Sequence, residues 1–157
     1  ERARVMGLGK FEAAIRNHQR IGLDSCLLIY FLEWRQVYGD LAEAVFGRVF
    51  DGRLRAVFSV VAMTELLVAP YRAGLDELIE SYRTRLTQMP NTEWIHADPD
   101  IAEVAAMLRG RHPSSRTSDA LHVATAIRTG ATAFVNNDAR IRDIRDIALI
   151  QMEDFVA

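Results

Sequence analysis

The chain has 157 residues, half of them hydrophobic and a quarter charged, which is the composition of an ordinary folded domain with its own core. Its net charge of −2 excludes a protein that binds nucleic acid through bulk positive charge, but not an enzyme that acts on nucleic acid. The single cysteine, Cys26, excludes a disulfide framework, and no apolar run is long enough to span a bilayer. We therefore expect a cytoplasmic protein with no membrane contact.

We expect one domain over residues 1–157. Residues 1–19 are predicted to be an N-terminal extension or a helix at the periphery, with Met6 as a candidate natural start. Short apolar runs rich in β-branched and aromatic residues predict strands. These runs cover 20–23, 55–60, 92–96, 131–135 and 147–152.

Apolar residues spaced three or four apart predict helices between these strands. The helices cover 11–18, 26–34, 41–49, 75–89, 100–108 and 117–129, and the stretch 59–70 turns from strand into helix, with Thr64 and Glu65 early in that helix. Strands that alternate with helices predict an α/β fold whose central sheet is mainly parallel.

Helix ends are predicted from capping and breaking residues. N-caps are expected at Asp24 or Ser25, at Asp98 before Pro99, and at Thr117 or Ser118. Interruptions or ends are expected at Gly39 and Asp40, Pro70, Gly110 and Gly130. The basic segment 109–116 is expected to be the most flexible loop of the chain.

The stretch from Thr117 to Ile141 organises the candidate site. A helix begins with Asp119 in its first turn, where the helix dipole favours a negative charge. The strand that follows delivers Asn136, Asn137 and Asp138 into the next turn. A helix N-terminus and the end of a neighbouring parallel strand lie on the same edge of a sheet, so we expect the two carboxylates to meet.

Four acids fall on this edge: Asp24, Glu65, Asp119 and Asp138. Each one alone has a structural explanation as a cap, a surface charge or a turn residue. Together they form a cluster in largely apolar surroundings, and the only lysine of the chain, Lys10, is far away in sequence. A divalent cation, Mg²⁺ or Mn²⁺, is the expected means of neutralising them.

Four segments make the chain similar to a known family. They are GLDSCLLI at 22–29, VVAMTELL at 60–67, SDALHVATAI at 118–127 and FVNNDARI at 134–141. They resemble the PIN-domain ribonucleases, in particular the toxins of VapBC-type toxin–antitoxin pairs. The resemblance implies a three-layer α/β/α PIN fold, a Mg²⁺ or Mn²⁺ cofactor and cleavage of RNA. It also implies a homodimer, and an antitoxin whose peptide lies in a groove beside the site.

The resemblance assigns roles to the four acids. Asp24, Asp119 and Asp138 would bind metal directly or through water, and Glu65 would act through a bound water. A departure occurs at Asn136, where many members of the family have Thr or Ser; its amide is expected to support the cluster. Ser25 supports the cluster or simply caps the helix that follows.

Other polar residues have two interpretations each. Arg109, Arg111 and Arg116, with His112, either grip RNA phosphates or are solvated loop charges. His122 lies one turn after Asp119 on the same helix face, so it either touches the site or is a packed or surface histidine. We favour the second interpretation because oxygen-ligand metals rarely need imidazole. Asp143 and Asp146 are interpreted as surface residues, with an approach of Asp143 to the cluster as the alternative.

The segment 28–45 carries many large apolar residues, and we interpret it as core or as a groove for a partner helix. These residues are Leu28, Tyr30, Phe31, Leu32, Trp34, Val37, Tyr38, Leu41 and Val45. An antitoxin and a second copy of the chain would fit such a groove equally well.

Three functions are therefore weighed. The first is a metal-dependent RNA endonuclease, the toxin of a toxin–antitoxin pair. The second is a non-catalytic PIN-like module that binds RNA or protein, against which the presence of all four acids argues. The third is a metal-dependent phosphatase on another α/β sheet, which is disfavoured because no D-x-D pair follows the first strand.

Overall fold

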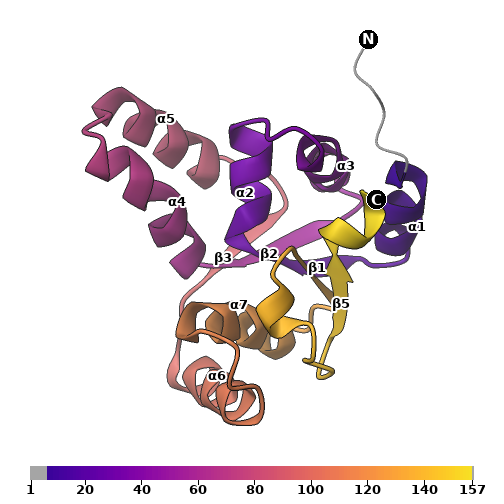
Figure 1. Cartoon of the computed structure of the whole chain (residues 1–157). Coiled ribbons are helices and arrows are strands. Elements are labelled where there is room, and N and C mark those ends of the chain that lie inside the picture. The colour runs from indigo at the N-terminus through magenta and orange to yellow at the C-terminus, as the bar shows by residue number, and fades with distance from the viewer. Residues whose placement is uncertain (1–6, 157) are drawn as a thin grey trace.

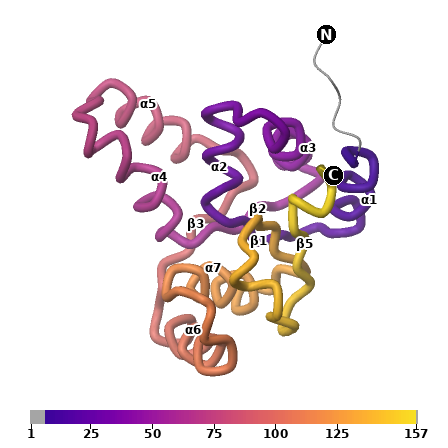
Figure 2. Tube along the Cα trace, in the orientation of Figure 1, coloured from indigo at the N-terminus to yellow at the C-terminus, as the bar shows by residue number. Residues whose placement is uncertain are grey.

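A parallel sheet of five strands is the centre of the protein in the computed structural model, which describes residues 7–156 (Figures 1 and 2). The strands are β1 (Arg20–Leu23), β2 (Arg55–Ser59), β3 (Thr92–Ile95), β4 (Ala133–Asn136) and β5 (Ala148–Gln151). Their order is β3-β2-β1-β4-β5, and every pairing in it is parallel. All five predicted strands and the α/β class are confirmed.

Seven α-helices are described, and they cover both faces of the sheet, as the three-layer prediction requires (Figure 1). They are α1 (Leu8–Arg16), α2 (Ser25–Leu32), α3 (Tyr38–Phe50), α4 (Val61–Arg72), α5 (Asp76–Thr87), α6 (Pro99–Arg111) and α7 (Thr117–Arg128). The first five pack in one hydrophobic core, and α6 and α7 pack in a second. Two short 3₁₀ helices, Ala139–Ile141 and Met152–Phe155, flank β5.

Alternating side chains of the central strands divide these two cores. Ala133 and Val135 of β4 point into the core of α1–α5, while Phe134 between them points into the core of α6 and α7. Gly22 of β1 lies beside Phe134, and a Cβ atom added to Gly22 would overlap the Cβ of Ala126 on α7. The missing side chain at Gly22 is what allows α7 to lie directly on the sheet.

We expect Gly22→Ala to lower the free energy of unfolding by about 2 kcal/mol, because the added methyl group overpacks the contact between β1 and α7. Gly47→Ala is the matched control: no atom lies within 4 Å of the added Cβ, and alanine favours the helix interior. It should stabilise the protein by about 0.5–1 kcal/mol. Urea denaturation measures both values, and equal effects of the two substitutions would contradict this account of the packing.

The strand order creates a switch point between β1 and β4. From β1 the chain moves outward through β2 and β3, then returns to place β4 and β5 on the other side of β1. Ligand sites of parallel α/β sheets occur beyond the carboxyl ends of the strands at such a point. Asp24 follows β1 and Asp138 follows β4, so these two acids flank the switch point.

Three predicted helix ends are wrong. Helix α3 includes Gly39 and Asp40, and Gly39 is buried where an added Cβ atom would lie only 3.2 Å from the Trp34 ring. Helix α4 continues through Pro70 to Arg72, and Pro70 is buried inside it. Helix α6 continues through Gly110 to Arg111, so a helical glycine does not by itself end a helix.

The basic segment 109–116, predicted to be a flexible loop, is helical in its first three residues. These three residues belong to α6, and Arg109 donates to the carbonyl of Ser115 at 3.2 Å and to Thr117 Oγ1 at 2.9 Å. The N-cap of α7 is Arg116 and not Thr117 or Ser118, because the Asp119 carboxylate accepts the Arg116 backbone N–H at 2.9 Å. The caps at Asp98 and the helix start at Pro99 are confirmed.

Residues 1–19 were predicted to be an extension or a peripheral helix, and the structure describes only part of this segment, from residue 7 onward. Met6 and the residues before it lie outside the described part of the chain. Helix α1 buries Phe11 and Ile15 in the main core, and the Phe11 ring packs edge-on against Phe155 with centroids 5.2 Å apart. Helix α1 therefore contributes to the core. Within residues 7–156, no helix is both long and apolar enough to cross a membrane.

Candidate functional site

All four predicted acids line one pocket at the carboxyl edge of the sheet. The pocket has a volume of about 310 Å³. Its lining consists of Asp24, Ser25, Cys26, Ile29, Glu65, Arg116, Asp119, Asn137, Asp138 and Arg140. The topology therefore brings together acids that are up to 114 residues apart in sequence.

Local structure explains why each acid points to this place. Asp24 is the N-cap residue of α2, and its backbone N–H donates to the carbonyl of Val135 on β4 at 3.1 Å. Asp119 lies in the first turn of α7, and Asp138 caps the 3₁₀ turn after β4. Glu65 lies one turn into α4, which follows β2. Three helix starts and one strand end thus converge on the pocket.

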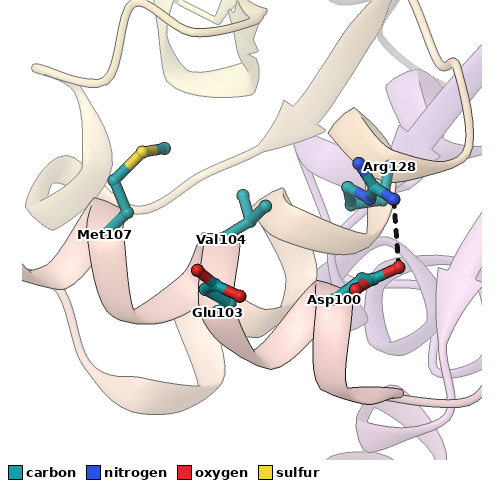
Figure 3. Close-up of a pocket in the computed structure, with 5 residues that line it drawn as sticks. All are labelled: Asp100, Glu103, Val104, Met107 and Arg128. Carbon is teal, nitrogen blue, oxygen red and sulfur yellow. Dashed lines mark hydrogen bonds and ion pairs between the residues drawn. The ribbon is translucent and has the colours of Figure 1, made fainter.

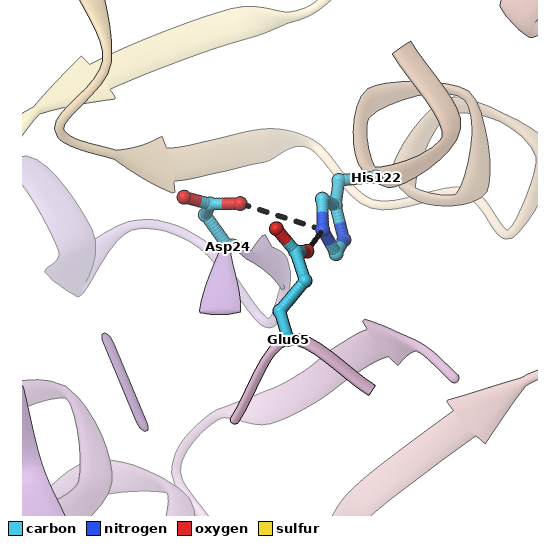
Figure 4. Close-up of side chains that lie close together, drawn as sticks. All are labelled: Asp24, Glu65 and His122. Carbon is cyan, nitrogen blue, oxygen red and sulfur yellow. Dashed lines mark hydrogen bonds and ion pairs between the residues drawn. The ribbon is translucent and has the colours of Figure 1, made fainter. Parts of the chain in front are cut away.

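One half of the cluster consists of Asp24, Glu65 and His122 (Figure 4). The Nε2 atom of His122 is hydrogen-bonded to Glu65 Oε1 and lies 3.7 Å from Asp24 Oδ1. Each of the three side chains offers one ligand atom, and these three atoms all lie within 4.8 Å of one another. Among the described residues, this is the group of three that has the spacing of a metal site.

Contact of His122 with the site is the alternative that sequence disfavoured. The His122 side chain is only 1% exposed and lies against both Asp24 and Glu65. The interpretation as a packed histidine is right about its burial but misses its two carboxylate neighbours. The sequence signal for it is the spacing of three between Asp119 and His122, which places both on one face of the helix.

The three groups alter one another's pKa values. Burial raises the pKa of Asp24, and the nearby His122 only partly offsets this. For His122, burial acts to lower the pKa, but the hydrogen bond to Glu65 and the charges of Asp24 and Glu65 outweigh it, so its pKa is raised. For Glu65, burial acts to raise the pKa, but His122 outweighs it and the pKa is lowered. The imidazolium form of His122 is thus favoured beside an ionised Glu65.

The other half of the cluster consists of two acids and two arginines. The guanidinium of Arg140 contacts both oxygens of Asp138, with Nη2 2.6 Å from Oδ2 and Nε 3.0 Å from Oδ1. The Arg140 Nε atom also lies 3.9 Å from Asp119 Oδ2. Arg116 lies 3.5 Å from Asp119 Oδ2 through Nε and 3.9 Å from Asp138 Oδ2 through Nη2.

Arg116 and Arg140 alter the charge balance that the sequence led us to expect at the pocket. For Asp138, burial acts to raise the pKa, but the hydrogen bonds and charge of Arg140 outweigh it, so the pKa is lowered. No lysine lies near these acids in the sequence. The fold supplies His122, Arg116 and Arg140 instead, so mutual repulsion of the acids does not by itself require a metal ion.

Ser25 and Asn136 differ in their relation to the pocket. Ser25 lines it and is buried. Asn136 is fully buried below it, and its Oδ1 accepts the backbone N–H of Asp138 at 3.0 Å, so its amide fixes the turn that carries this acid. Asn137, which lines the pocket, donates to the Tyr30 hydroxyl at 3.1 Å. Sequence reasoning gave Asn137 no role of its own.

Cys26 also lines the pocket, beside Asp24. Burial, with the negative charge of Asp24, raises the pKa of the Cys26 thiol well above its usual range. The neutral thiol is therefore favoured, and such a group is a weak nucleophile.

Of the predicted RNA-binding arginines, Arg116 lines the pocket, whereas Arg109 and Arg111 do not. The Arg109 side chain is bonded within the loop that joins α6 to α7. Arg111 lies 3.4 Å from Asp146, which is exposed. Asp143 is also exposed, as predicted.

The apolar segment 28–45 is largely used for packing. Leu28, Leu41 and Val45 are fully buried in the main core. Tyr30 and Tyr38 stack with ring centroids 4.8 Å apart, beside the pocket residue Asn137. Of the other large apolar residues of the segment, Phe31, Leu32 and Trp34 are half-buried and Val37 is exposed.

A second depression lies on the outer side of α6 and differs in character (Figure 3). It is lined by Asp100, Glu103, Val104, Met107 and Arg128, and its three charged side chains are all exposed. Asp100 is already paired with Arg128 at 3.2 Å. The acidic pocket is therefore the candidate functional site.

The donor atoms of the acidic pocket suit a divalent cation. Carboxylate oxygens are the ligands that Mg²⁺ and Mn²⁺ prefer, and an added imidazole nitrogen suits Mn²⁺ and the later transition metals better than Mg²⁺. Asp24, Glu65 and His122 offer such atoms at metal-site spacing, and Asp119 and Asp138 line the same pocket. The residues present therefore fit the cofactor that the sequence predicts.

Comparisons with known proteins agree with this architecture. A structure described as "Toxin-antitoxin complex from Klebsiella pneumoniae" matches with a TM-score of 0.65 and 17% identity, over 85% of this chain and 98% of that chain. VapBC2 from Rickettsia felis, solved bound to a DNA fragment from its promoter, matches with a TM-score of 0.65 and 16% identity over the same shares of the two chains. At this identity the likeness concerns the fold. No curated protein matches the chain. The family model for the PIN domain matches residues 21–147, so the chain belongs to the PIN domain family.

Proposed function

We propose that the protein is a metal-dependent RNA endonuclease and the toxin of a toxin–antitoxin pair. The observation that carries the proposal is the convergence of Asp24, Glu65, Asp119 and Asp138 on one pocket of a PIN domain. Asp24, Asp119 and Asp138 would hold Mg²⁺ or Mn²⁺, directly or through water. The bound cation would supply charge neutralisation at the scissile phosphate and a water molecule of lowered pKa.

The remaining chemistry is assigned to the side chains of the chain. Glu65 would accept a hydrogen bond from the attacking water and orient it in line with the phosphodiester bond. His122, bonded to Glu65, would hold that carboxylate in place. Asn136 would fix Asp138 through the backbone bond at 3.0 Å. Hydrolysis in this geometry would leave a 5′-phosphate and a 3′-hydroxyl.

The partners follow from the fold relatives. Both were solved as complexes of toxin–antitoxin systems, which supports an antitoxin as a partner of this chain. We propose that the antitoxin covers the half-buried aromatic surface of Tyr30 and Tyr38, because it lies next to the pocket residue Asn137. A homodimer and a cytoplasmic location belong to the same proposal, the latter because the described thiol, Cys26, is free.

Metal binding provides the first test. At a Mn²⁺ concentration of one hundred times the dissociation constant, the thermal midpoint should rise by about 5–10 °C. Asp24→Asn should abolish this rise. Asp100→Asn, which removes an exposed acid that is paired with Arg128 outside the pocket, should retain it. Differential scanning fluorimetry measures all three proteins.

RNA cleavage provides the second test. A labelled single-stranded RNA should be cut in Mg²⁺ or Mn²⁺, left intact in EDTA, and cut again when the cation is restored. Cleavage that persists in the chelator would refute the metal-dependent mechanism. If the RNA is bound but never cut and Mn²⁺ gives no stabilisation, the non-catalytic binding module would be the correct function.

A further inference from the structure

Two arginines lie at the rim of the acidic pocket, and the nuclease mechanism above leaves them without a role. Arg116 precedes α7, and Arg140 lies in the 3₁₀ turn after β4. Their side chains are 58% and 43% exposed, although their guanidinium groups are directed at Asp119 and Asp138. They are therefore accessible from solvent while lying within ion-pair distance of two candidate metal ligands.

The contact between Arg140 and Asp138 has the geometry of a fork. Two guanidinium nitrogens of Arg140 meet the two carboxylate oxygens of Asp138, at 2.6 Å and 3.0 Å. The backbone N–H of Arg140 also donates to Asp138 Oδ1 at 2.9 Å. A guanidinium group offers the same paired donors to a phosphate as to a carboxylate. The group that binds Asp138 is thus equally suited to a phosphodiester.

The same contact places Arg140 in competition with a cation. A divalent ion bound by Asp138 needs the oxygens that Arg140 contacts, and its positive charge would repel the guanidinium. Arg140 would then lose its partner at the point where the substrate phosphate must lie. A phosphate oxygen would replace the carboxylate as the acceptor, so substrate and cation would stabilise each other's binding.

The charge of the pocket gives a second argument. Four carboxylates at one site repel a polyanion, and the whole chain carries a net charge of −2. Arg116 and Arg140 are the basic residues that line the pocket. An RNA strand that enters the pocket would meet these two guanidinium groups first, because they are the more exposed side chains.

We propose that Arg140, assisted by Arg116, is the phosphate-binding group of this site. It lies on Asp138 when no cation is bound and transfers to an RNA phosphate when Asp138 binds the cation. The inference rests on the proposed nuclease function and specifies how the same site holds its substrate.

Substitution of Arg140 tests this exchange, because two affinities should change in opposite directions. Arg140→Met keeps an apolar stem and removes the charge, so the affinity for Mn²⁺ should rise about tenfold, since a competing positive charge is gone. The affinity for a short single-stranded RNA should fall about tenfold. The slope of the logarithm of this affinity against the logarithm of the salt concentration should decrease in magnitude by about 0.7, the value for one phosphate contact. Isothermal titration with Mn²⁺ alone measures the first, and fluorescence anisotropy of labelled RNA in Ca²⁺ measures the second.

Two further variants make the result specific. Arg142→Met is the matched control: Arg142 lies two residues further on, and its side chain pairs with Glu153 and Asp154 instead of the pocket acids. Both affinities should stay at wild-type values in this variant. Arg140→Lys keeps the charge and loses the fork, so its RNA affinity should fall between those of wild type and Arg140→Met.

The outcomes separate this inference from the function on which it rests. Wild-type protein that binds neither Mn²⁺ nor RNA would overturn the proposed function itself. If wild type binds both and Arg140→Met behaves like Arg142→Met, the nuclease proposal stands and the exchange is wrong. Weaker Mn²⁺ binding by Arg140→Met would also overturn the exchange, because it would mean that Arg140 only orders Asp138 for the metal.

Discussion

Asp119→Asn is expected to reduce RNA cleavage by about a hundredfold to a thousandfold while leaving the protein folded. The substitution removes one negative oxygen from the candidate cation site without changing the size of the side chain. An asparagine oxygen can still accept the backbone N–H of Arg116, which Asp119 accepts at 2.9 Å, so the start of α7 should be retained. Initial rates on a labelled RNA at saturating Mn²⁺ measure the effect.

The structural control for Asp119→Asn is its free energy of unfolding in EDTA. We expect this value to change by less than about 1 kcal/mol, because the variant loses charge contacts to the exposed Arg116 and Arg140 and also loses repulsion from Asp138. Full activity in a correctly folded Asp119→Asn protein would remove Asp119 from the catalytic set. A loss of folding would instead assign it a capping role.

His122→Leu is expected to lower the free energy of unfolding at pH 6 by about 2 kcal/mol and to slow cleavage by about tenfold or more. The buried imidazole is the partner of Glu65 and the neighbour of Asp24, so its removal leaves two partly buried acids without a cation beneath them. His122→Gln places an amide N–H near the position of Nε2. This variant should therefore retain part of the stability and part of the cleavage rate that His122→Leu loses. Equal damage in the two variants would indicate a purely packing role.

The contact between His122 and Glu65 predicts that the stability of the metal-free protein depends on pH. The pKa of His122 is raised in the folded state, so above its ordinary value of 6.5 the folded protein binds more protons than the unfolded chain. Stability from this group is therefore fully present below pH 6.5 and is lost as the pH rises through the raised pKa. Urea denaturation in EDTA between pH 6 and 8, below the range in which Cys26 ionises in the unfolded chain, should show this loss in wild type, and His122→Gln should lack it.

Metal affinity should respond to pH in the opposite direction. A cation bound beside Glu65 favours neutral His122, so binding releases a proton and the affinity for Mn²⁺ should increase with pH. Titration calorimetry in two buffers of different ionisation enthalpy counts the released proton. An affinity that is independent of pH would show that His122 does not titrate with the site.

The sequence by itself determined the class of the fold and the edge of the sheet that carries the chemistry. The strands β1, β2, β4 and β5 are short and mainly apolar runs, a pattern that is typical of buried strands in a parallel sheet. The acids could also be placed, because Asp24 and Asp138 directly follow strands and Asp119 begins a helix. In a parallel sheet these positions share one edge, whatever the strand order.

Helix ends were less predictable, because they depend on what the helix packs against. Gly39 and Pro70 lower helix propensity, yet both are buried inside helices. At position 39 the Trp34 ring lies so close that an added Cβ atom would be only 3.2 Å from it, which favours glycine there. Tertiary packing of this kind outweighs a local preference of about 1 kcal/mol or more, and no sequence pattern reports it.

Only the tertiary structure decided which charges neutralise the acids. His122 meets Glu65 across 57 residues of sequence, and the route passes through a strand, two helices and the switch in strand order. Arg116 reaches Asp138 on the neighbouring segment only because α7 begins at the edge of the sheet where β4 ends. A linear sequence fixes the identity of a charged group, whereas the strength of its interaction depends on distance and burial, which exist only after folding.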